Sequence, residues 1–282
     1  KYIGSEKRLR QPLYRQVATL TPSTWNTVLP AVKSAIATQV KATPGKFAAI
    51  ISPWATVEEA YLLAKLLKGM SPEVTLALGP VRTVGGDDHY PKTVTGAPPK
   101  NVKFTIRAEK CPNRQGVEGV LQHFQGSVIP FETVAAAVGA GKYDGLFVLN
   151  SDPEANFSAE FVQAAGKLKL LVVEDLLESS LSHAAHYVLA GAAWAEKEGT
   201  FVNHAGLAQG IFRGVRGPGE ARPDGRILWE LNDRKGLFRA STVRQEIAGE
   251  IKSFAALILG DLGEHGVMLK SPEPAAKELQ PA

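Results

Sequence analysis

The stretch FAAIISPWATVEEAYLLAKLLKGMSPEVTLALG, residues 47–79, decides the fold of this chain. It opens with FAAIIS (Phe47–Ser52), a continuous apolar run of the kind that forms a strand buried on both faces of a parallel sheet. A helix follows, with Thr56 placed to cap it and with Glu58 and Glu59 in its first turn, where carboxylates interact favourably with the helix dipole. VTLALG then forms the next strand, so the stretch predicts a strand–helix–strand unit.

The same alternation continues along the chain. LFVLNS, LKLLVVED and HYVLAG are further apolar strands, and SAEFVQAAGKL and LLESSLSHA are the helices between them. A helix from about Phe131 to Gly139 precedes them, and a helix from Ser23 to about Lys41 precedes the first strand. The apolar residues that indicate this first helix recur every four positions: Val28, Val32, Ile36 and Val40. Five buried strands separated by helices predict an α/β fold with a Rossmann-like, doubly wound and mainly parallel sheet.

Two segments depart from this alternation. Residues 82–110 are rich in Gly and Pro and predict an irregular excursion with one short strand at VKFTIRA. Between Ser241 and Leu262, apolar residues recur every three or four positions, which predicts a six-turn C-terminal helix docked on the body. The expected organisation is an N-terminal arm (1–22), an α/β domain (23–235), a C-terminal helical segment (236–270) and a frayed tail (271–282).

The composition excludes several classes of protein. Hydrophobic residues make up 44% and charged residues 21% of the chain, as in ordinary globular proteins. The net charge of +4 comes from scattered Lys and Arg residues, which does not indicate nucleic-acid binding. No apolar run approaches the roughly 20 residues of a membrane helix, and the first residues lack both a secretory signal and Met, which favours a fragment of a longer protein. The single cysteine, Cys111, cannot hold an iron–sulfur cluster, which normally takes four thiolates.

Polar residues gather where the predicted strands end. In an open parallel sheet, ligands bind beyond the carboxyl ends of the strands, where helix N-termini direct N–H groups outward. The candidate site residues are Ser52, Asn150, Ser151, Asp152, Glu174 and Asn203. The alternative is that the Asn-Ser-Asp segment only caps the following helix. Asp152 and Glu174 would repel a phosphate unless an arginine compensated, so we expect a small, polar, vestigial pocket.

Other chemistry is poorly supported. GGDD with His89 resembles a solvated loop more than a metal site, because adjacent Asp side chains point in divergent directions. His183 and His186 lack the further ligand that a metal needs. GAGKYDG precedes a strand, whereas phosphate-binding glycine loops follow one, and no G-x-S-x-G elbow is present. We therefore predict no catalytic residue and no metal site in this region.

The segment AEKEGTFVNHAGLAQ (195–209) is too particular for a plain loop. It resembles the motif "E-x-x-G-T-x-x-N-x-E-G-R-x-Q" of the molybdopterin oxidoreductase superfamily. The residues on matching positions are Glu196, Gly199, Thr200, Asn203, Gly206 and Gln209. RLRQPLYR, SPWATVEEAYLLAKLL, CPNRQGVEGVL and VRQEI resemble further patches of that superfamily in the same order. The spacings are most similar to those of one of its branches, the large peripheral-arm subunits (G subunits) of bacterial NADH-quinone oxidoreductases, or complex I.

The departures from this pattern bear on function. His186 stands where the family usually has Asp, and Ala190 where it has Pro. The final β-barrel domain that grips the pterin dinucleotide is missing, and the segment before Cys111 is short. The resemblance therefore implies a structural and docking scaffold without molybdopterin, whose iron–sulfur clusters would lie in preceding domains. The motif would then be retained architecture, with Gly199 and Gly206 permitting positive-φ turns and Asn203 holding a loop.

The resemblance also implies partners and a location. A chain of the G-subunit type would contact other peripheral-arm subunits of an NADH dehydrogenase complex, bind no nucleic acid, and reach the membrane only through that complex on its cytoplasmic face. Two alternatives remain open. One is a fragment of an active molybdopterin (bis-MGD) oxidoreductase such as a formate dehydrogenase, and the other is a nucleotide-binding module.

Overall fold

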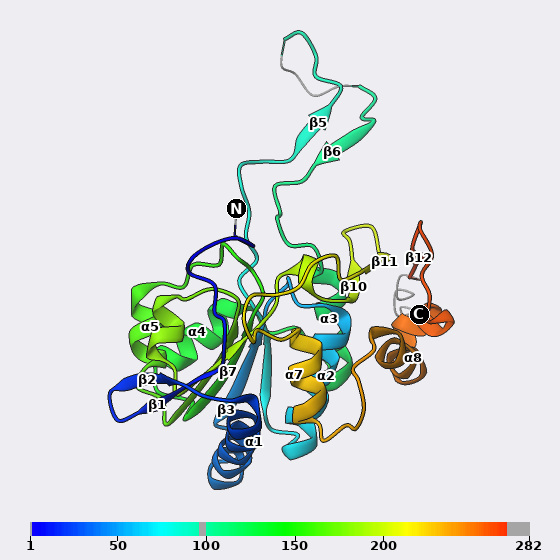
Figure 1. Cartoon of the computed structure of the whole chain (residues 1–282). Helices are drawn as coiled ribbons and strands as arrows, with labels where there is room; N and C mark the ends of the chain where they lie inside the picture. The colour runs from blue at the N-terminus through cyan, green and yellow to red at the C-terminus, as the bar shows by residue number, and fades with distance from the viewer. Residues whose placement is uncertain (1, 96–99, 270–282) are drawn as a thin grey trace, which may run out of the picture.

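The computed structural model describes residues 2–95 and 100–269, with the side chain of Leu259 left out. The predicted tail, 271–282, lies outside these residues. Five parallel strands form the centre of the fold (Figure 1). In spatial order they are β4 (Thr75–Leu78), β3 (Phe47–Ile51), β7 (Gly145–Asn150), β8 (Leu170–Asp175) and β9 (Tyr187–Ala190). This order reverses direction between β3 and β7, as in a doubly wound sheet. The predicted parallel α/β sheet is confirmed.

Helices cover both faces of this sheet, and their apolar sides explain why. The helices α1 (Trp25–Ala42) and α2 (Val57–Met70) bury the residues that the sequence pattern selects, including Val32, Ile36 and Leu63. Figure 1 places α4 (Phe131–Gly139) and α5 (Ala159–Ala165) on the opposite face from α2 and from α7 (Asp224–Leu231). A short helix, α6 (Ser180–Ala184), joins β8 to β9.

An antiparallel hairpin extends the sheet at the β9 edge. It consists of β1 (Leu13–Gln16) and β2 (Thr19–Pro22), and β1 pairs with β9 through Leu13 opposite Val188. The sequence pattern predicts an N-terminal arm for this segment and no strands there. The hairpin strands are short and half exposed, so their sequence has no continuous apolar run.

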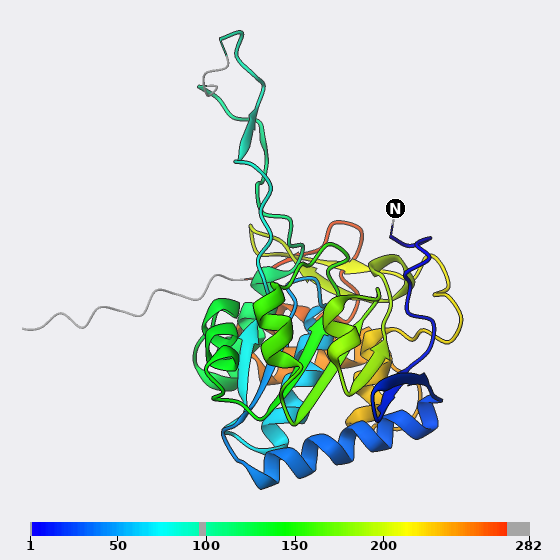
Figure 2. The same ribbon diagram turned by 90° about the vertical axis from the view of Figure 1, so that its left-hand side faces the viewer.

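The excursion over residues 82–110 is a hairpin that projects from the body (Figures 1 and 2). Its strands are β5 (Asp88–Tyr90) and β6 (Phe104–Ile106), and the rings of Tyr90 and Phe104 stack at 4.8 Å. The strand expected within VKFTIRA is therefore present, while its partner β5 was not predicted. The helix α3 (Arg114–Gln125) that follows was also not predicted.

The predicted six-turn helix from Ser241 to Leu262 is wrong in its second half. The α-helix α8 (Ala240–Glu250) stops before Ile251, which is extended (φ −108°, ψ 104°), and a 3₁₀ helix, η2 (Lys252–Leu259), follows. Ile258, which a straight helix would bury, is 55% exposed. The break brings the Phe254 ring against Gly119 of α3, so packing against a neighbouring helix overrides the four-residue spacing.

A second, smaller sheet lies beside the strand ends of the first. It consists of β10 (Gly199–Val202), β11 (Leu207–Ile211) and β12 (Val267–Met268), and a short 3₁₀ helix, η1 (Trp194–Glu196), precedes it. β10 contacts α2, α3 and α8. In the ranges that the structure describes, no helix is both long enough and apolar enough to cross a bilayer.

Candidate functional site

Five of the six residues predicted at the strand ends lie along the carboxyl edge of β3, β7 and β8. They are Ser52, Asn150, Ser151, Asp152 and Glu174, and all five are buried. The parallel register brings them together, since β7 and β8 align Asn150 with Asp175. The sixth residue, Asn203, belongs to the turn between β10 and β11.

Lys197, which the sequence analysis did not single out, occupies the middle of this edge. Its Nζ atom donates hydrogen bonds to Glu59 Oε2 (2.8 Å) and Asp224 Oδ2 (3.0 Å), and lies 3.4 Å from Ser151 Oγ. The Lys197 side chain is 1% exposed, and its carboxylate partners are equally enclosed. Lys197 thus ties together α2, α7 and the loop after β7. The available signal was its place between Glu196 and Glu198 inside the motif.

Carboxyl groups outnumber this lysine at the edge. Burial raises the pKa of Glu59 to about 7, even though Lys197 lowers it. Burial also raises the pKa of Asp175 to about 7, against hydrogen bonds from Asn150 and backbone N–H groups. For Lys197, burial alone lowers the pKa, but the charges of Asp224 and Glu59 more than offset this and raise it. The lysine is therefore held in its charged form, whereas Glu59 and Asp175 have pKa values raised toward neutral pH.

Glu174 is the most isolated of these groups. It is fully buried, and neither of its carboxylate oxygens accepts a hydrogen bond from any residue that the structure describes. Burial first, and then the negative charges of Asp224 and Glu59, raise its pKa well above the ordinary value. Its burial and these neighbouring charges therefore favour the neutral form of the Glu174 side chain over the carboxylate.

Asp152 has the compensating arginine that the sequence analysis required. Arg82, at the base of the projecting hairpin, places Nε 3.6 Å from Asp152 Oδ2 and Nη1 3.1 Å from Glu154 Oε2. Asp152 Oδ1 also accepts a hydrogen bond from the Glu154 N–H (2.9 Å), which forms an Asx-turn after β7. Arg82 therefore serves two local carboxylates and is not available to an incoming phosphate.

The motif at 195–209 holds separate parts of the chain together. Glu196 forms a buried two-point ion pair with Arg8 of the N-terminal arm, at 2.7 and 2.6 Å. Thr200 donates through both its N–H (2.8 Å) and Oγ1 (2.6 Å) to Glu58 of α2. Arg244 of α8 donates from Nε to Thr200 Oγ1 (2.9 Å). The motif thereby connects the arm, α2 and α8 through buried charged hydrogen bonds.

The glycines and Asn203 of the motif act on the backbone. Gly206 has φ +81°, as expected of a turn glycine, and Asn203 Oδ1 accepts hydrogen bonds from Ala205 N–H (2.8 Å) and Leu207 N–H (3.1 Å). Gly199 does not need positive φ, which corrects the expectation for that residue. A Cβ atom there would lie 2.4 Å from the Thr56 side chain, so Gly199 allows β10 to approach the start of α2.

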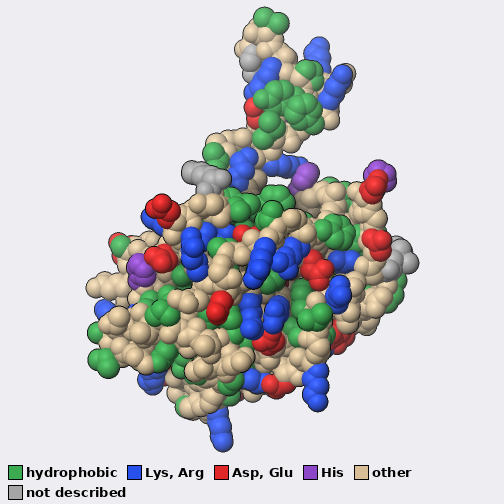
Figure 3. All heavy atoms as spheres, viewed as in Figure 1, with side chains coloured by type: hydrophobic (Ala, Val, Ile, Leu, Met, Phe, Trp, Pro, Cys, Tyr) green, Lys and Arg blue, Asp and Glu red, His purple; other side chains and the backbone are tan. Residues whose placement is uncertain are grey.

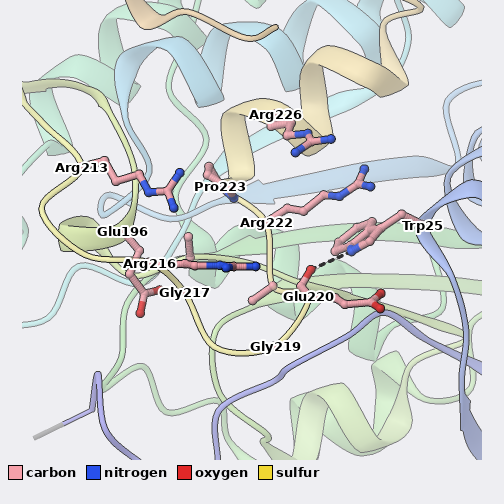
Figure 4. Close-up of a pocket in the computed structure, with 12 residues that line it drawn as sticks. Trp25, Glu196, Arg213, Arg216, Gly217, Gly219, Glu220, Arg222, Pro223 and Arg226 are labelled. Carbon is pink, nitrogen blue, oxygen red and sulfur yellow. Dashed lines mark hydrogen bonds between the residues drawn. The ribbon is translucent and has the colours of Figure 1, made fainter.

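A separate cavity of about 580 Å³ lies between the loop after β11 and the start of α7 (Figure 4). None of the six predicted site residues lines it. Its charged lining residues are Glu196, Arg213, Arg216, Glu220, Arg222 and Arg226. Figure 3 shows Lys and Arg side chains gathered on this face of the molecule. Although basic residues are scattered over the chain as a whole, these four arginines lie within residues 213–226, on one loop and the start of α7.

A sequence model described as molybdopterin oxidoreductase matches residues 8–91 and 119–234, more than half of the chain. The chain belongs to the molybdopterin oxidoreductase family. The match skips residues 92–118, which include the returning strand of the projecting hairpin and the first turn of α3. The family resemblance inferred from the motif is thus confirmed. The complex I branch is one of several branches of this family to which the chain is similar.

Relatives within this molybdopterin oxidoreductase family differ in their named reactions. The alpha subunit of an F420-dependent formate dehydrogenase from Methanococcus maripaludis is 37% identical over 42% of this chain and 18% of its own length. The alpha subunit of an NADPH-Fe(3+) oxidoreductase from Geobacter sulfurreducens is 30% identical over 44% of this chain and 15% of its own. The G subunit of NADH-quinone oxidoreductase from Escherichia coli is 35% identical over 29% and 9%. The matched segments are therefore a minor part of much longer relatives.

Among solved structures, acetylene hydratase from Pelobacter acetylenicus superposes with a TM-score of 0.47 and 10% identity. The superposition covers 82% of this chain and 62% of that one.

The strand-end residues of this family member do not fit a molybdopterin dinucleotide. A dinucleotide needs hydrogen-bond donors for its pyrophosphate, and here the edge presents Asp152, Glu174 and Asp175. Lys197 is already shared between Glu59 and Asp224. A pyrophosphate would meet the Asp152 carboxylate in a region of low dielectric, and the carboxyl groups that are neutral there would offer no positive charge to offset it.

Proposed function

We propose that this chain is the structural and docking region of an oxidoreductase component of the complex I G-subunit type, and that it has lost molybdopterin binding. The observation that supports the proposal is the closure of the strand-end edge by Lys197 and its buried carboxyl partners. Internal side chains there occupy positions at which α/β sheets ordinarily bind ligands. A region of this kind would organise the surrounding protein while redox centres elsewhere carry electrons.

The motif residues support a structural role. The contacts of Glu196, Lys197 and Thr200 are all directed to other parts of the same chain, and all three residues are buried. A catalytic group has to reach a substrate, whereas the charged and polar atoms of these three residues are engaged by partners within the chain. The side chains of the motif therefore hold the arm, α2, α7 and α8 together.

The second candidate is a part of an active molybdopterin enzyme. The identity to F420-dependent formate dehydrogenase alpha subunits, 37% and 33% over 42% and 45% of the chain, favours it. In that case the residues that contact the cofactor would come from other regions of the longer protein. The nucleotide-binding module is the weaker candidate at the strand ends, because the carboxyl groups there repel phosphate.

The partners follow from the first proposal. A component of this type would contact other peripheral-arm subunits of an NADH dehydrogenase complex. Its iron–sulfur clusters would lie in domains outside this chain, and it would reach the inner face of the cell membrane only as part of the complex.

Metal and pterin analysis of the purified full-length protein separates the two candidates. We expect less than about 0.1 molybdenum per protein, together with iron from the cluster domains and co-purification with NADH dehydrogenase subunits. Stoichiometric molybdenum and pterin would instead establish the formate-dehydrogenase-type candidate.

A substitution at the strand ends adds an independent test. Asp152→Ala in the assembled complex should leave NADH oxidation nearly unchanged, because Asp152 holds only Arg82 and a loop N–H. A loss greater than about tenfold, or roughly 1.4 kcal/mol of transition-state stabilisation, in a correctly assembled complex would contradict the proposal.

A further inference from the structure

The projecting hairpin is fastened to the body at its base. The Val84 N–H donates to the Ala108 carbonyl (2.8 Å). The Lys110 N–H donates to the Arg82 carbonyl (2.9 Å), and the Arg82 side chain forms ion pairs with two carboxylates in the loop after β7. Beyond this base, β5 and β6 extend away from the rest of the fold in both views (Figures 1 and 2). The body therefore presents these two strands as a ribbon at a defined place.

One face of this ribbon is apolar and uncovered. Tyr90 lies directly opposite Phe104, and Ile106 lies two residues further along β6, so all three side chains point to the same face. Phe104 is 57% exposed and Ile106 is 49% exposed, although the Tyr90 ring stacks on Phe104. Figure 3 shows apolar side chains gathered on the hairpin. Exposed apolar side chains that lie together mark interaction sites more often than single ones do.

A ribbon of this size has little stability of its own. Its opposite face contributes a polar contact between His89 Nδ1 and Thr105 Oγ1, which lie 2.9 Å apart. Each strand is three residues long, and a lone two-stranded hairpin is only marginally stable in water. The apolar face would gain packing and lose contact with water if another surface covered it. The ribbon is therefore stabilised by a partner on this face.

Positive charge accompanies the apolar face. The two aspartates of the ribbon, at positions 87 and 88, already form ion pairs with basic side chains of the same hairpin. Lys100 and Lys103 are exposed on the returning arm, and neither has an ion pair recorded among the residues that the structure describes. These two lysines leave the ribbon with an excess of positive charge, so the surface that complements it is acidic.

We propose that the ribbon docks, through Tyr90, Phe104 and Ile106, into an apolar groove rimmed by carboxylates on a neighbouring protein subunit. Such a contact would belong to the docking role proposed above and rests on it, since the chain must then work within a multi-subunit oxidoreductase.

The polar atoms of the ribbon favour an acidic protein over other surfaces. A second copy of the chain would bring the same unpaired lysines together, and like charges repel. An acyl layer offers no hydrogen-bond partners, whereas this face carries the Tyr90 hydroxyl, which donates to Asp88 Oδ2 (3.0 Å). A protein groove can supply fixed donors and acceptors to these atoms as it covers the rings beside them.

The docking face also lies largely outside the region that the family model matches. The match ends at residue 91 and resumes at residue 119, so it omits Phe104, Ile106 and both unpaired lysines. The strand-end edge and the buried motif lie inside the matched region. The ribbon is therefore suited to a contact particular to the assembly of this chain.

Site-specific photo-crosslinking in the assembled complex tests this contact. The full-length protein is produced together with its partner subunits and carries Phe104→p-benzoylphenylalanine. Leu237→p-benzoylphenylalanine is the matched control, because Leu237 is 72% exposed on the body. The crosslinked peptides are identified by mass spectrometry. The Phe104 crosslink is then measured in two charge-reversed backgrounds, Lys100→Glu/Lys103→Glu and, on the body, Lys142→Glu/Lys167→Glu.

We expect the Phe104 crosslink to fall in one subunit other than this chain, within a segment where Asp and Glu outnumber Lys and Arg. Its yield should drop about tenfold with Lys100→Glu/Lys103→Glu and stay unchanged with the control pair. The docking site is rejected if the crosslinks join two copies of this chain, reach lipid only, or do not exceed those at Leu237. It is also rejected if both charge-reversed backgrounds crosslink equally well.

Molybdenum content of the same preparation keeps this outcome separate from that of the proposed function. A crosslink to an acidic segment in a complex with stoichiometric molybdenum would retain the docking site and reject the G-subunit type. A complex without molybdenum in which Phe104 gives no such crosslink would reject the docking site alone.

Discussion

The Nζ atom of Lys197 lies 2.8 Å from Oε2 of Glu59, and both side chains are almost completely buried. The two residues are far apart in sequence, one in the motif and one in the first turn of α2. Their contact explains why the strand-end edge is closed in this chain, because the same lysine also holds Asp224 at the start of α7. An internal ion cluster occupies the position at which parallel α/β sheets ordinarily bind ligands.

Lys197→Met should destabilise the protein by about 3–5 kcal/mol, because it leaves buried carboxyl groups without their cation. Urea unfolding followed by circular dichroism measures the change. Lys33→Met is the matched control, since its ion pair with Asp233 is solvent-exposed and should contribute less than about 1 kcal/mol. Equal losses of unfolding free energy in the two variants would show that the buried ion cluster stabilises the protein no more than an exposed ion pair does.

The pH dependence of stability should reflect Asp175, whose pKa burial raises to about 7. A carboxyl group with a raised folded pKa binds more protons when folded, so its contribution is lost as pH rises from about 4 to above 7. Asp175→Asn should therefore flatten the decline in unfolding free energy between pH 5 and pH 8. His186, whose pKa burial lowers, acts in the opposite direction in both proteins and cancels in the comparison. An identical pH profile in the variant would contradict the assignment.

Thr200→Val should cost about 1–3 kcal/mol in unfolding free energy, because the Glu58 carboxylate and Arg244 both lose the hydroxyl between them. Thr200→Ser keeps the hydroxyl and should retain most of the stability. Chemical denaturation of the two variants side by side tests the hydrogen bond separately from the volume of the side chain. A serine variant as unstable as the valine variant would point to lost packing instead.

Gly119→Ala should destabilise the protein, although alanine is the better helix former, because its Cβ would lie 2.7 Å from Phe254 Cζ. In a Phe254→Leu background the same change should become neutral or stabilising. Gly249→Ala in α8 is the control, since nothing lies within 4 Å of its Cβ position, and it should stabilise by about 0.5–1 kcal/mol. Thermal unfolding of the wild type, Gly119→Ala, Phe254→Leu and the double variant gives the coupling free energy between positions 119 and 254. Additive effects would mean that α3 and η2 do not pack as described.

The local pattern predicted well wherever burial is uniform along an element. Phe47–Ile51 is buried at every residue, so its apolar run indicates a parallel strand without further information. The Thr56 cap was also predictable, because the Thr56 hydroxyl and the Glu59 carboxylate form a capping box within four residues. Elements whose surroundings vary along their length were predicted less well. The hairpin at Leu13–Pro22 and the break at Ile251 are both set by contacts with distant segments.

By itself, the sequence determined the parallel α/β core and the family motif, because hydrophobic period and capping are local properties of the chain. Only the tertiary structure decided what the motif does. Lys197 meets Glu59 and Asp224 because the sheet brings together segments that are remote in sequence. The energy of a charged group depends on its burial and on the charges beside it, and its neighbours along the chain determine neither of these.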